Sequence, residues 1–499
     1  MKVSFIHPNL YGELITNIGL AYLMTVTQSA HQVSFIDLAF HRTNWEKYVK
    51  WMITKNHPDV IAVSCLTFNF SIGLKIISLI KEMDPTIPTI FGGIHPTLLP
   101  EEVLSYKAVD AICIGEGEET FPEYLEHLEK NISLNGVKGI WFKEDGKIIR
   151  NELRPLVSNL DNLPVPNWDL WEIEKYLTIA PHSKTIEMLG SRGCPYSCTY
   201  CSNYALRQLL PGKYVRFRSA ENIVSEIKIL KEKYGRKGFR FIEFWDEIFG
   251  MNKKILEQFR KLYIEEGLNK EIFWVCNNRA DLVTESWARL AKSAGCMLVQ
   301  MGVEAGNEKI RNQIYHKNVS TEQIINATRI LNRNDIMMRF NLMLGGPGEN
   351  ISTMEESVHI VDQLKPESFF FSIFQPLPKT EILKKINELQ GDINYNGWNN
   401  NPDFWQKSLL NLPNLKSKDI VKFKRKITLK YIWNYFWLGL RLRNFTFIKD
   451  ILKFLLIIKP RYHVLLQFLM VYTIRQYQIG DWIKRNEKYF SKVKLCESH

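Results

Sequence analysis

The sequence predicts an α/β protein in which a doubly wound parallel sheet is followed by a partial (β/α)6 barrel and a helical C-terminal region. Two series of short apolar runs alternate with helix-like stretches, the first over residues 1–130 and the second over 181–385. Strands that form continuous apolar runs are typical of parallel sheets covered on both faces. Beyond about residue 385 the alternation stops, and the chain becomes basic, aromatic and helix-like.

The strands follow in order along the chain. The first series predicts five of them, at residues 2–6, 33–37, 60–66, 89–93 and 108–115. Residues 131–180 are interpreted as a linker that contains a hairpin with its turn at Asp145-Gly146. The second series predicts six strands of a TIM-like partial barrel, at residues 185–190, 238–245, 272–278, 297–306, 337–346 and 368–377. In such a barrel, reactive groups lie at the C-terminal ends of the strands.

The composition is that of a globular protein, because 45% of the residues are apolar and 24% are charged. The N-terminal segment lacks the apolar run of a secretory signal, so we expect a cytoplasmic protein. That compartment suits the five cysteines that are scattered singly along the chain. We interpret them as reduced core thiols: Cys65, Cys113, Cys276, Cys296 and Cys496.

The net charge of +12 belongs to the C-terminal region, because residues 417–499 contain 18 Lys or Arg against 5 Asp or Glu. The uncharged runs at 431–440 and 462–474 are shorter than the roughly 18 residues that a membrane span needs. Basic residues interleaved with aromatics favour a helix on the anionic cytoplasmic face of a membrane. The tryptophans concerned are Trp433, Trp437 and Trp482. A helical cap packed on the barrel is the alternative, and nucleic acid is disfavoured because the aromatics are not spaced as stacking platforms.

Three cysteines in the spacing CxxxCxxC directly follow the first predicted barrel strand: Cys194, Cys198 and Cys201. Thiolates at such spacing can hold an iron–sulfur cluster, and Gly190 and Gly193 permit tight turns around it. Three thiolates leave one iron of a 4Fe-4S cluster open to another ligand. A zinc knuckle is the alternative, but no fourth Cys or His stands at zinc spacing, and the nearest preceding histidine is His182.

The segment CPYSCTYC resembles the signature of the radical S-adenosylmethionine (SAM) family, including the aromatic Tyr200 before the third cysteine. The resemblance implies a 4Fe-4S cluster whose open iron chelates SAM. FIEFWDEIF, MGVEAGNEKI and FNLMLGGPGEN resemble later motifs of the family in order and spacing. The SAM-binding residues implied in this way are Tyr200, Asp246, Glu304, Gly345, Gly346 and Pro347. FQPLPKTEI departs from the more common Pro-Gly-Thr by having Lys379.

Ser64-Cys65-Leu66 ends the third predicted strand and Gly92-Gly93 ends the fourth. This pattern resembles the cobalamin-binding fold, which implies that a hydroxyl and bare glycine backbone line a slot for the nucleotide tail of cobalamin. GGIHPTLLPEE and IGEGEETF also resemble the cobalamin-binding subfamily of radical SAM enzymes. The cobalamin-binding residues implied by this resemblance are Ser64, Leu66, Thr67, Gly92, Gly93, His95 and Glu116.

The Asp-x-His-x-x-Gly loop of cobalamin-binding domains is missing, because residues 12–22 contain no histidine. The resemblance therefore implies a cobalt without a protein imidazole ligand. His95 follows Gly92-Gly93, where a polar loop contact is the alternative to an axial ligand. For the whole domain, the alternative is a degenerate sheet that has lost cobalamin.

By this resemblance we expect an enzyme in which the reduced cluster cleaves SAM to a 5′-deoxyadenosyl radical that takes hydrogen from an unactivated carbon. Methylcobalamin then supplies a methyl group, which implies a C-methyltransferase for an apolar or natural-product-like substrate. A flavodoxin or ferredoxin would supply the electron. Two alternatives stay open. One is a cobalamin-dependent cyclisation or carbon–carbon coupling on a lipid or tetrapyrrole, and the other is a non-catalytic cobalamin-binding regulatory protein.

Overall fold

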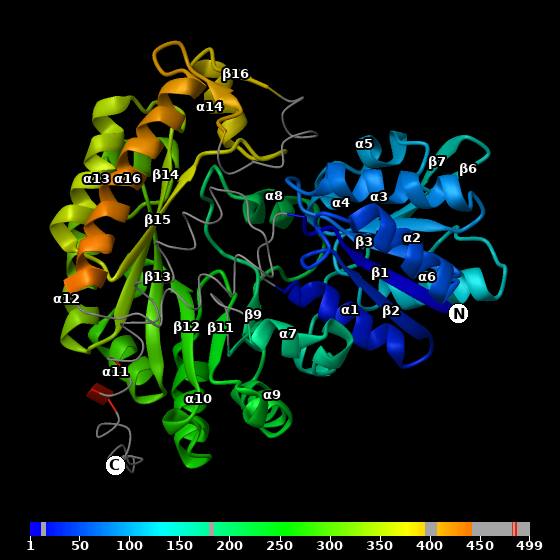
Figure 1. Ribbon diagram of the computed structural model, residues 1–499, viewed down its shortest axis with the longest axis horizontal. Helices are drawn as coiled ribbons and strands as arrows, with labels where there is room; N and C mark the ends of the chain where they lie inside the picture. The colour runs from blue at the N-terminus through cyan, green and yellow to red at the C-terminus, as the bar shows by residue number, and fades with distance from the viewer. Residues whose placement is uncertain (11–15, 179–183, 395–406, 442–481, 483–484, 487–499) are drawn as a thin grey trace.

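A computed structural model describes residues 1–10, 16–178, 184–394, 407–441, 482 and 485–486. Two large sheets lie side by side, a seven-stranded sheet at the N-terminal end and a six-stranded curved sheet after it (Figure 1). The six-stranded sheet and five strands of the seven-stranded sheet are parallel and joined mainly by helices, as the apolar runs predict. The α/β fold class, with a doubly wound sheet before a partial barrel, is confirmed, and the described part of the C-terminal region contains a long helix over 417–441.

The N-terminal sheet has helices on both faces. Its parallel strands have the order β2-β1-β3-β4-β5, and Phe5 and Ile6 on β1 pack into different hydrophobic clusters because successive side chains point to opposite faces. Phe5 packs with α1 and α6, and Ile6 packs with α2 and α3. The elements are β1 (Lys2–His7), α1 (Ile18–Gln28), β2 (Gln32–Asp37), α2 (Trp45–Asn56), β3 (Val60–Ser64), α3 (Phe70–Met83), β4 (Thr89–Gly92), α4 (Ile94–Leu98), α5 (Pro100–Ser105), β5 (Ala111–Cys113) and α6 (Thr120–Glu129).

The hairpin of β6 (Ile140–Glu144) and β7 (Lys147–Arg150) extends this sheet beyond residue 130, because β6 pairs antiparallel with β5. Its turn is at Asp145-Gly146, as predicted, and both residues have positive φ. The linker that follows is packed rather than free. Trp168 and Trp171 are buried in the core that they share with β1. The linker contains η1 (Leu160–Asn162), η2 (Trp168–Trp171) and α7 (Ile173–Thr178).

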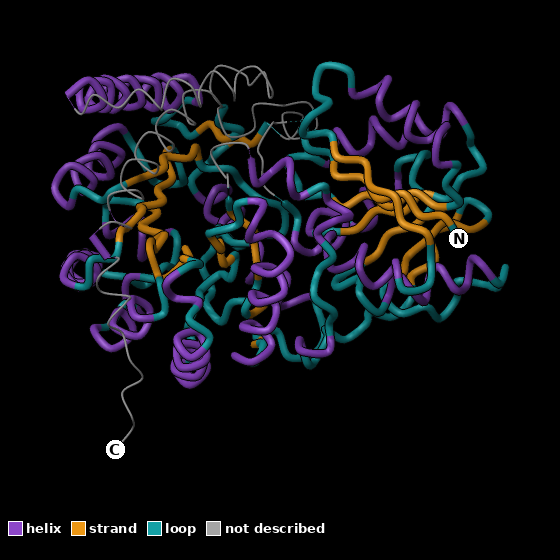
Figure 2. Tube along the Cα trace, turned by 60° about the horizontal axis from the view of Figure 1, so that its bottom comes forward, coloured by secondary structure: helices purple, strands orange, loops and turns teal. Residues whose placement is uncertain are grey.

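Six parallel strands form the curved half-barrel, in the order β15-β14-β13-β12-β11-β8. Figure 2 shows their curvature beside the flatter N-terminal sheet. The strands are β8 (Thr185–Met188), β11 (Phe241–Phe244), β12 (Phe273–Asn278), β13 (Cys296–Glu304), β14 (Met337–Leu344) and β15 (Ser368–Ile373). A two-stranded antiparallel ribbon of β9 (Ser191–Arg192) and β10 (Arg216–Phe217) lies beyond β8.

Several helices of the half-barrel start at side-chain caps. Ser219, Thr284 and Ser320 each accept a hydrogen bond from a backbone N–H of the first turn that follows, which ends each connecting loop at a fixed residue. The elements are α8 (Ser202–Leu209), α9 (Ala220–Tyr234), η3 (Gly235–Lys237), α10 (Lys253–Glu265), η4 (Leu268–Lys270), η5 (Ala280–Leu282), α11 (Glu285–Ser293), the π-helix η6 (Ile310–Ile314), α12 (Thr321–Arg333), α13 (Ile351–Leu364) and α14 (Ile382–Glu388).

The C-terminal region packs on the half-barrel at two places. After β16 (Asp392–Ile393) and β17 (Leu410–Asn411), helix α16 (Ser417–Arg441) lies beside α13 and β15 (Figure 1). Tyr431 packs on Phe369 with ring centroids 4.4 Å apart and donates a 2.9 Å hydrogen bond to Asp362. Trp482 is fully buried among apolar side chains at the N-terminal ends of β11 to β14. These contacts agree with the helical cap.

Trp482 is therefore not available as a lipid contact, which corrects one part of the membrane hypothesis. The side chains of Trp433 and Trp437, and the run at 462–474, lie outside the described residues. Within the described part of the chain, no helix is both long and apolar enough to cross a membrane. Four of the scattered cysteines are buried free thiols, as predicted: Cys65, Cys113, Cys276 and Cys296. Cys496 lies outside the described residues.

Candidate active site

The three cysteines of the CxxxCxxC motif lie in the loop between β9 and α8. Cys198 is buried and its backbone carbonyl accepts a 3.1 Å hydrogen bond from Cys201 N–H, while Cys194 and Cys201 are partly exposed. Burial raises the pKa of the Cys194 and Cys201 thiols, so their thiolates need nearby positive charge. Arg279 lies 4.0 Å from the Cys198 sulfur, and bound iron would supply the larger part of that charge.

Asp246 fixes the start of this loop. Its carboxylate accepts hydrogen bonds from Gly190 N–H at 2.8 Å and from the Ser191 hydroxyl at 2.5 Å. The side chain is almost fully buried, and burial raises its pKa to about 7. Gly193 follows with φ of 86°, and a Cβ there would collide with the Tyr214 carbonyl. Asp246 thus holds the cysteine loop, and its predicted contact with SAM stays a prediction.

The far side of the loop is tied to the segment that follows β13. Thr199 donates through its hydroxyl to Ile314 O at 2.7 Å and through its N–H to Tyr315 O at 3.0 Å. Arg207 on α8 donates to Cys194 O at 3.2 Å and to the Ser197 hydroxyl at 2.8 Å. None of these bonds uses a thiol. The loop is therefore pre-shaped, with its three sulfurs left for iron.

The thiols do not surround a single ion. Among the described residues, no three Cys, His, Asp or Glu side chains converge closely enough to hold one metal ion. In a 4Fe-4S cluster each cysteine binds a different iron, and the cubane occupies the space between the three sulfurs. The three thiols lie near enough to act on one another electrostatically, and a set of three thiolate donors suits such a cluster.

Glu304 is the last residue of β13, and its backbone conformation is unusual. Its φ is 66°, a left-handed value that is uncommon for a residue other than glycine. It accepts a 2.8 Å hydrogen bond from Lys317, and both side chains are largely buried. Burial opposes the charge on Lys317, but Glu304 and Cys198 together raise the pKa of Lys317. Gly302 leaves room for the pair, because a Cβ there would collide with Glu304 Oε1.

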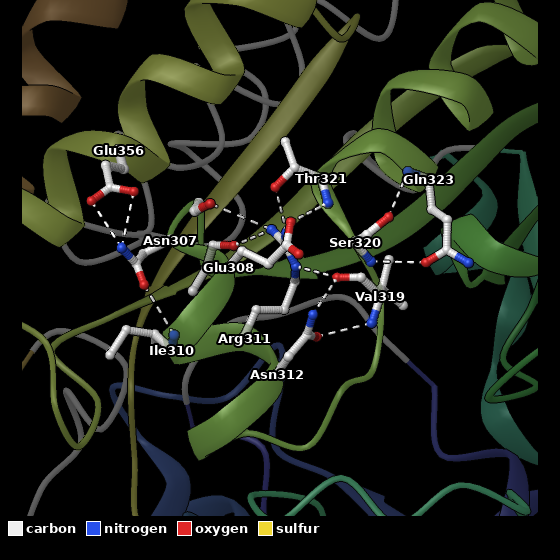
Figure 3. Close-up of polar contacts among 12 residues, drawn as sticks. Asn307, Glu308, Ile310, Arg311, Asn312, Val319, Ser320, Thr321, Gln323 and Glu356 are labelled. Carbon is white, nitrogen blue, oxygen red and sulfur yellow. Dashed lines mark hydrogen bonds and ion pairs between the residues drawn. The ribbon is translucent and has the colours of Figure 1, made fainter.

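Arg311 organises the segment that carries Lys317. This guanidinium is fully buried and donates to Val319 O at 2.7 Å, Ala305 O at 2.8 Å and the Thr321 hydroxyl at 2.7 Å (Figure 3). It extends from the π-helix η6, a distortion that often occurs at functional sites. The segment between β13 and α12 is thereby folded over Glu304 and the cysteine loop.

The glycines after β14 make close backbone approaches. A Cβ on Gly346 would collide with the hydroxyl of Tyr315, and Gly345 has φ of 81°. Glu349 accepts hydrogen bonds from Gly345 N–H at 2.7 Å and Gly346 N–H at 2.9 Å through one carboxylate oxygen. Its other oxygen and the Tyr315 hydroxyl are buried without a hydrogen-bond partner in the described residues. These two polar atoms leave hydrogen-bonding capacity for a ligand beside Gly345, Gly346 and Pro347.

Glu349 makes stability depend on pH. Burial raises its pKa to about 8, whereas an unfolded glutamate titrates near about 4.3. Between those values the native state binds more protons than the unfolded state, so stability falls as pH rises. We expect wild type to lose up to about 1.4 kcal/mol per pH unit relative to Glu349→Gln over that window. Urea unfolding from pH 5 to pH 9 measures the difference.

The matched control is Glu355→Gln, which changes an exposed carboxylate on the same helix, α13. Its stability should run parallel to that of wild type across the pH range. Above about pH 8 the wild-type and Glu349→Gln curves should also become parallel, because Glu349 is then charged in both states. Parallel curves below pH 8 would contradict the assignment of a raised pKa to Glu349.

A second site lies at the C-terminal ends of β3, β4 and β5. A cavity of about 200 Å³ there has glycine backbone and apolar side chains along its walls. Its glycines are Gly19, Gly92, Gly93, Gly115 and Gly117. Ser64 and Glu116 also line it, and Leu189 and Arg192 close it from the half-barrel. This volume suits part of a large cofactor, such as a nucleotide tail, and strand ends of a doubly wound sheet are where such ligands bind.

The remaining residues proposed for cobalamin do not line this cavity. His95 is buried, its Nδ1 lies 3.3 Å from the Thr67 hydroxyl, and its ring lies 4.3 Å from that of Phe70. Burial lowers the pKa of His95 to about 4, so the ring is neutral at physiological pH. Leu66 N–H donates to the Asn69 side chain at 2.8 Å in the same turn. These contacts favour the polar loop contact for His95 over an axial ligand.

Comparison with known proteins agrees with both sites. The B12 binding domain model matches residues 10–125, and the radical SAM superfamily model matches residues 188–361. An uncharacterized methyltransferase of Pyrococcus horikoshii is 30% identical over 366 residues, which are 73% of this chain and 77% of the relative. The chain belongs to the cobalamin-binding radical SAM enzymes. The domain predicted from Ser64 and Gly92 and the barrel predicted from the cysteine triplet are thus both confirmed.

Two further comparisons are with a cyclase and with the solved structure of a methyltransferase. The anaerobic magnesium-protoporphyrin IX monomethyl ester cyclase of Rubrivivax gelatinosus is 26% identical, over 78% of this chain and 70% of the cyclase. The solved structure of the radical SAM methyltransferase TsrM from Kitasatospora setae has a TM-score of 0.64 at 17% identity, and the match covers 78% of this chain and 76% of TsrM. At that identity the solved structure supports the fold alone.

As a cobalamin-binding radical SAM enzyme, the protein uses the cofactors that the sequence predicts: a 4Fe-4S cluster, SAM and cobalamin. The non-catalytic alternative is therefore excluded. Sequence reasoning missed the charged side chains that surround the sites, which are Lys317, Arg279, Arg192 and Glu349. The only available signals were Lys317 downstream of Gly-x-Glu and the Glu that follows Gly-Pro-Gly. Individual cofactor contacts of Tyr200, Glu304, Ser64 and the glycines stay predictions.

Proposed function

We propose that this enzyme is a C-methyltransferase that acts on an unactivated carbon of an apolar or natural-product-like substrate. The cavity that carries the proposal is bounded by two domains. Ser64, Gly92 and Gly93 line it from the N-terminal sheet, while Leu189 and Arg192 line it directly before Cys194. A methyl-carrying corrinoid and the radical-forming cluster must face one substrate, and this common boundary supports that arrangement.

When bound, the cluster and SAM supply a hydrogen-abstracting radical, and methylcobalamin supplies the methyl group. The chain contributes orientation and shielding. Asp246 and Thr199 hold the cysteine loop, Lys317 holds Glu304, and Glu349 holds the Gly345-Gly346 backbone. These contacts are buried or partly buried, which limits the access of water to the region in which a radical would form. A methyltransferase name on the Pyrococcus horikoshii relative supports methyl transfer as the outcome.

An apolar substrate is supported by the rim of the half-barrel. Trp245 follows β11 at its C-terminal end and is 41% exposed, which is unusual for so large an aromatic side chain. The proposal includes an electron donor such as a flavodoxin or ferredoxin, since cluster reduction needs one. Contact of residues 417–499 with an anionic cytoplasmic membrane face also stays a proposal. This membrane proposal concerns mainly residues that the structure does not describe.

Cyclisation without methyl transfer is the second candidate. The similarity to the Rubrivivax gelatinosus cyclase extends over more of this chain than the similarity to the methyltransferase, at lower identity. Both reactions begin with hydrogen abstraction, and the difference lies in the fate of the substrate carbon. The two candidates therefore differ in their products and in their consumption of SAM.

Product analysis separates these two functions. We expect the anaerobically reconstituted enzyme, with a low-potential reductant and a lipid and tetrapyrrole extract, to form S-adenosylhomocysteine and 5′-deoxyadenosine in about equal amounts. The methyl group of deuterium-labelled SAM should appear as a mass increase in one component of the extract, detected by mass spectrometry. Substrate-dependent 5′-deoxyadenosine without S-adenosylhomocysteine would contradict methylation and favour cyclisation.

A further inference from the structure

A charged cluster joins the N-terminal sheet to the iron–sulfur loop. Arg192 donates to Glu116 at 2.8 Å and to Glu118 at 2.6 Å, and it lies over the ring of Tyr22 at 5.3 Å. Arg216 donates to both oxygens of Glu116, at 2.7 and 2.9 Å. The four charged side chains are largely or fully buried. Charge-assisted bonds in such surroundings fix geometry strongly.

Arg192 is mechanically close to the cluster. Together with Ser191 it forms the two-residue strand β9. Arg192 pairs with Arg216 on β10, and Ser191 is hydrogen-bonded to Asp246. Gly193 comes next, and its backbone is pressed against Tyr214. Cys194 is the residue after that. A displacement of Arg192 therefore reaches the first cluster ligand across a single, closely packed glycine.

Arg192 also faces the cofactor cavity of the other domain. Arg192, Glu116 and Glu118 all line the cavity at the ends of β3, β4 and β5. The amide side chains and the phosphate of cobalamin offer both hydrogen-bond donors and acceptors to such a wall. A guanidinium held by two carboxylates can exchange one of these bonds for a bond to the ligand without becoming unpaired.

We propose that Arg192 is a positioning residue that couples the occupancy of the cobalamin cavity to the geometry of the iron–sulfur loop. Cobalamin contacts the Arg192–Glu118 pair, and β9 carries the effect to Cys194. The geometry of the iron–sulfur loop then depends on whether the corrinoid site is filled. This inference rests on cobalamin as a cofactor and is independent of the reaction outcome, so product analysis and the cobalamin titration can fail separately.

Anaerobic titration with hydroxocobalamin tests this coupling through Arg192. The absorbance change on binding gives the affinity, and Mössbauer spectroscopy of the oxidised cluster with SAM, which exchanges no electron with Co(III), gives the response of the iron site. We expect Arg192→Gln to bind hydroxocobalamin at least about tenfold more weakly than wild type. Its iron content should equal that of wild type. The wild-type cluster signal should change on addition of hydroxocobalamin, and the Arg192→Gln signal should not change even at saturation.

Glu118→Gln keeps the shape of the side chain and the Arg216–Glu116 pair, so it provides a second variant that is less demanding for folding. It should weaken binding in the same direction. Arg154→Gln is the matched control, because Arg154 pairs with Glu123 on α6 and does not line the cavity. Hydroxocobalamin affinity within twofold of wild type in Arg192→Gln and Glu118→Gln would overturn the proposal. An equal loss in Arg154→Gln, or a wild-type cluster signal that ignores hydroxocobalamin, would also overturn it.

Discussion

Replacing Cys198 with alanine should abolish reductive cleavage of SAM. Cys198 is the buried member of the triplet and has Arg279 4.0 Å from its sulfur. Its loss leaves two thiolates, which are too few to hold a cubane with a single open iron. We expect iron and sulfide content to fall well below four per chain after anaerobic reconstitution. No 5′-deoxyadenosine should form with dithionite, as measured by chromatography and mass spectrometry.

The control is Cys276→Ala, which removes a fully buried free thiol from β12. This variant should keep its iron and its SAM cleavage, because Cys276 belongs to the barrel core and not to the loop after β9. SAM cleavage by Cys198→Ala at a rate near that of wild type would contradict the assignment of the triplet. Loss of iron from both variants would indicate a general folding effect of removing a thiol.

The Lys317→Met chain should be less stable by about 3 kcal/mol, because the change leaves the Glu304 carboxylate largely buried and uncompensated. The pair is joined at 2.8 Å, and both side chains are largely buried. Urea unfolding of the cluster-free chain at pH 7 measures the free energy of unfolding.

Lys430→Met offers a comparison with the same change in side chain. Lys430 pairs with Asp362 at 2.7 Å, and both side chains are exposed by more than 40%. Exposed pairs contribute about 0–1 kcal/mol, so this variant should remain within about 1 kcal/mol of wild type. Equal losses of unfolding free energy in the two variants would show that the Glu304–Lys317 pair stabilises the fold no more than an exposed pair does.

The fold was largely predictable because its strands are buried on both faces. Every strand predicted within the first 380 residues is present, and the predicted and observed strands differ only in where they begin and end. Residues 108–115, for example, contain only the three residues of β5, since buried loops continue the apolar run beyond the ladder. The attachment of the β6–β7 hairpin to β5 was not predictable, because pairing depends on which strand is left at the edge of the sheet.

The candidate site was predictable where its chemistry is local in sequence. Cys194, Cys198 and Cys201 lie within eight residues, and their spacing alone indicates the cluster. Long-range partners have no such signature. Glu116 and Arg192 are 76 residues apart, and no periodicity relates them. His95 follows two glycines, which left a cobalt ligand and a polar loop contact both open, and its place outside the cavity beside Thr67 favours the loop contact.

The burial of Trp482 at the N-terminal ends of β11 to β14 has a consequence for synthesis of the chain. Phe273 on β12 and Met337 on β14 belong to the apolar cluster that this tryptophan completes. All six strands leave the ribosome well before residue 482 does, so the base of the half-barrel stays uncovered while the last hundred or so residues are made. A nascent chain therefore presents an apolar surface that folding of its earlier parts cannot remove.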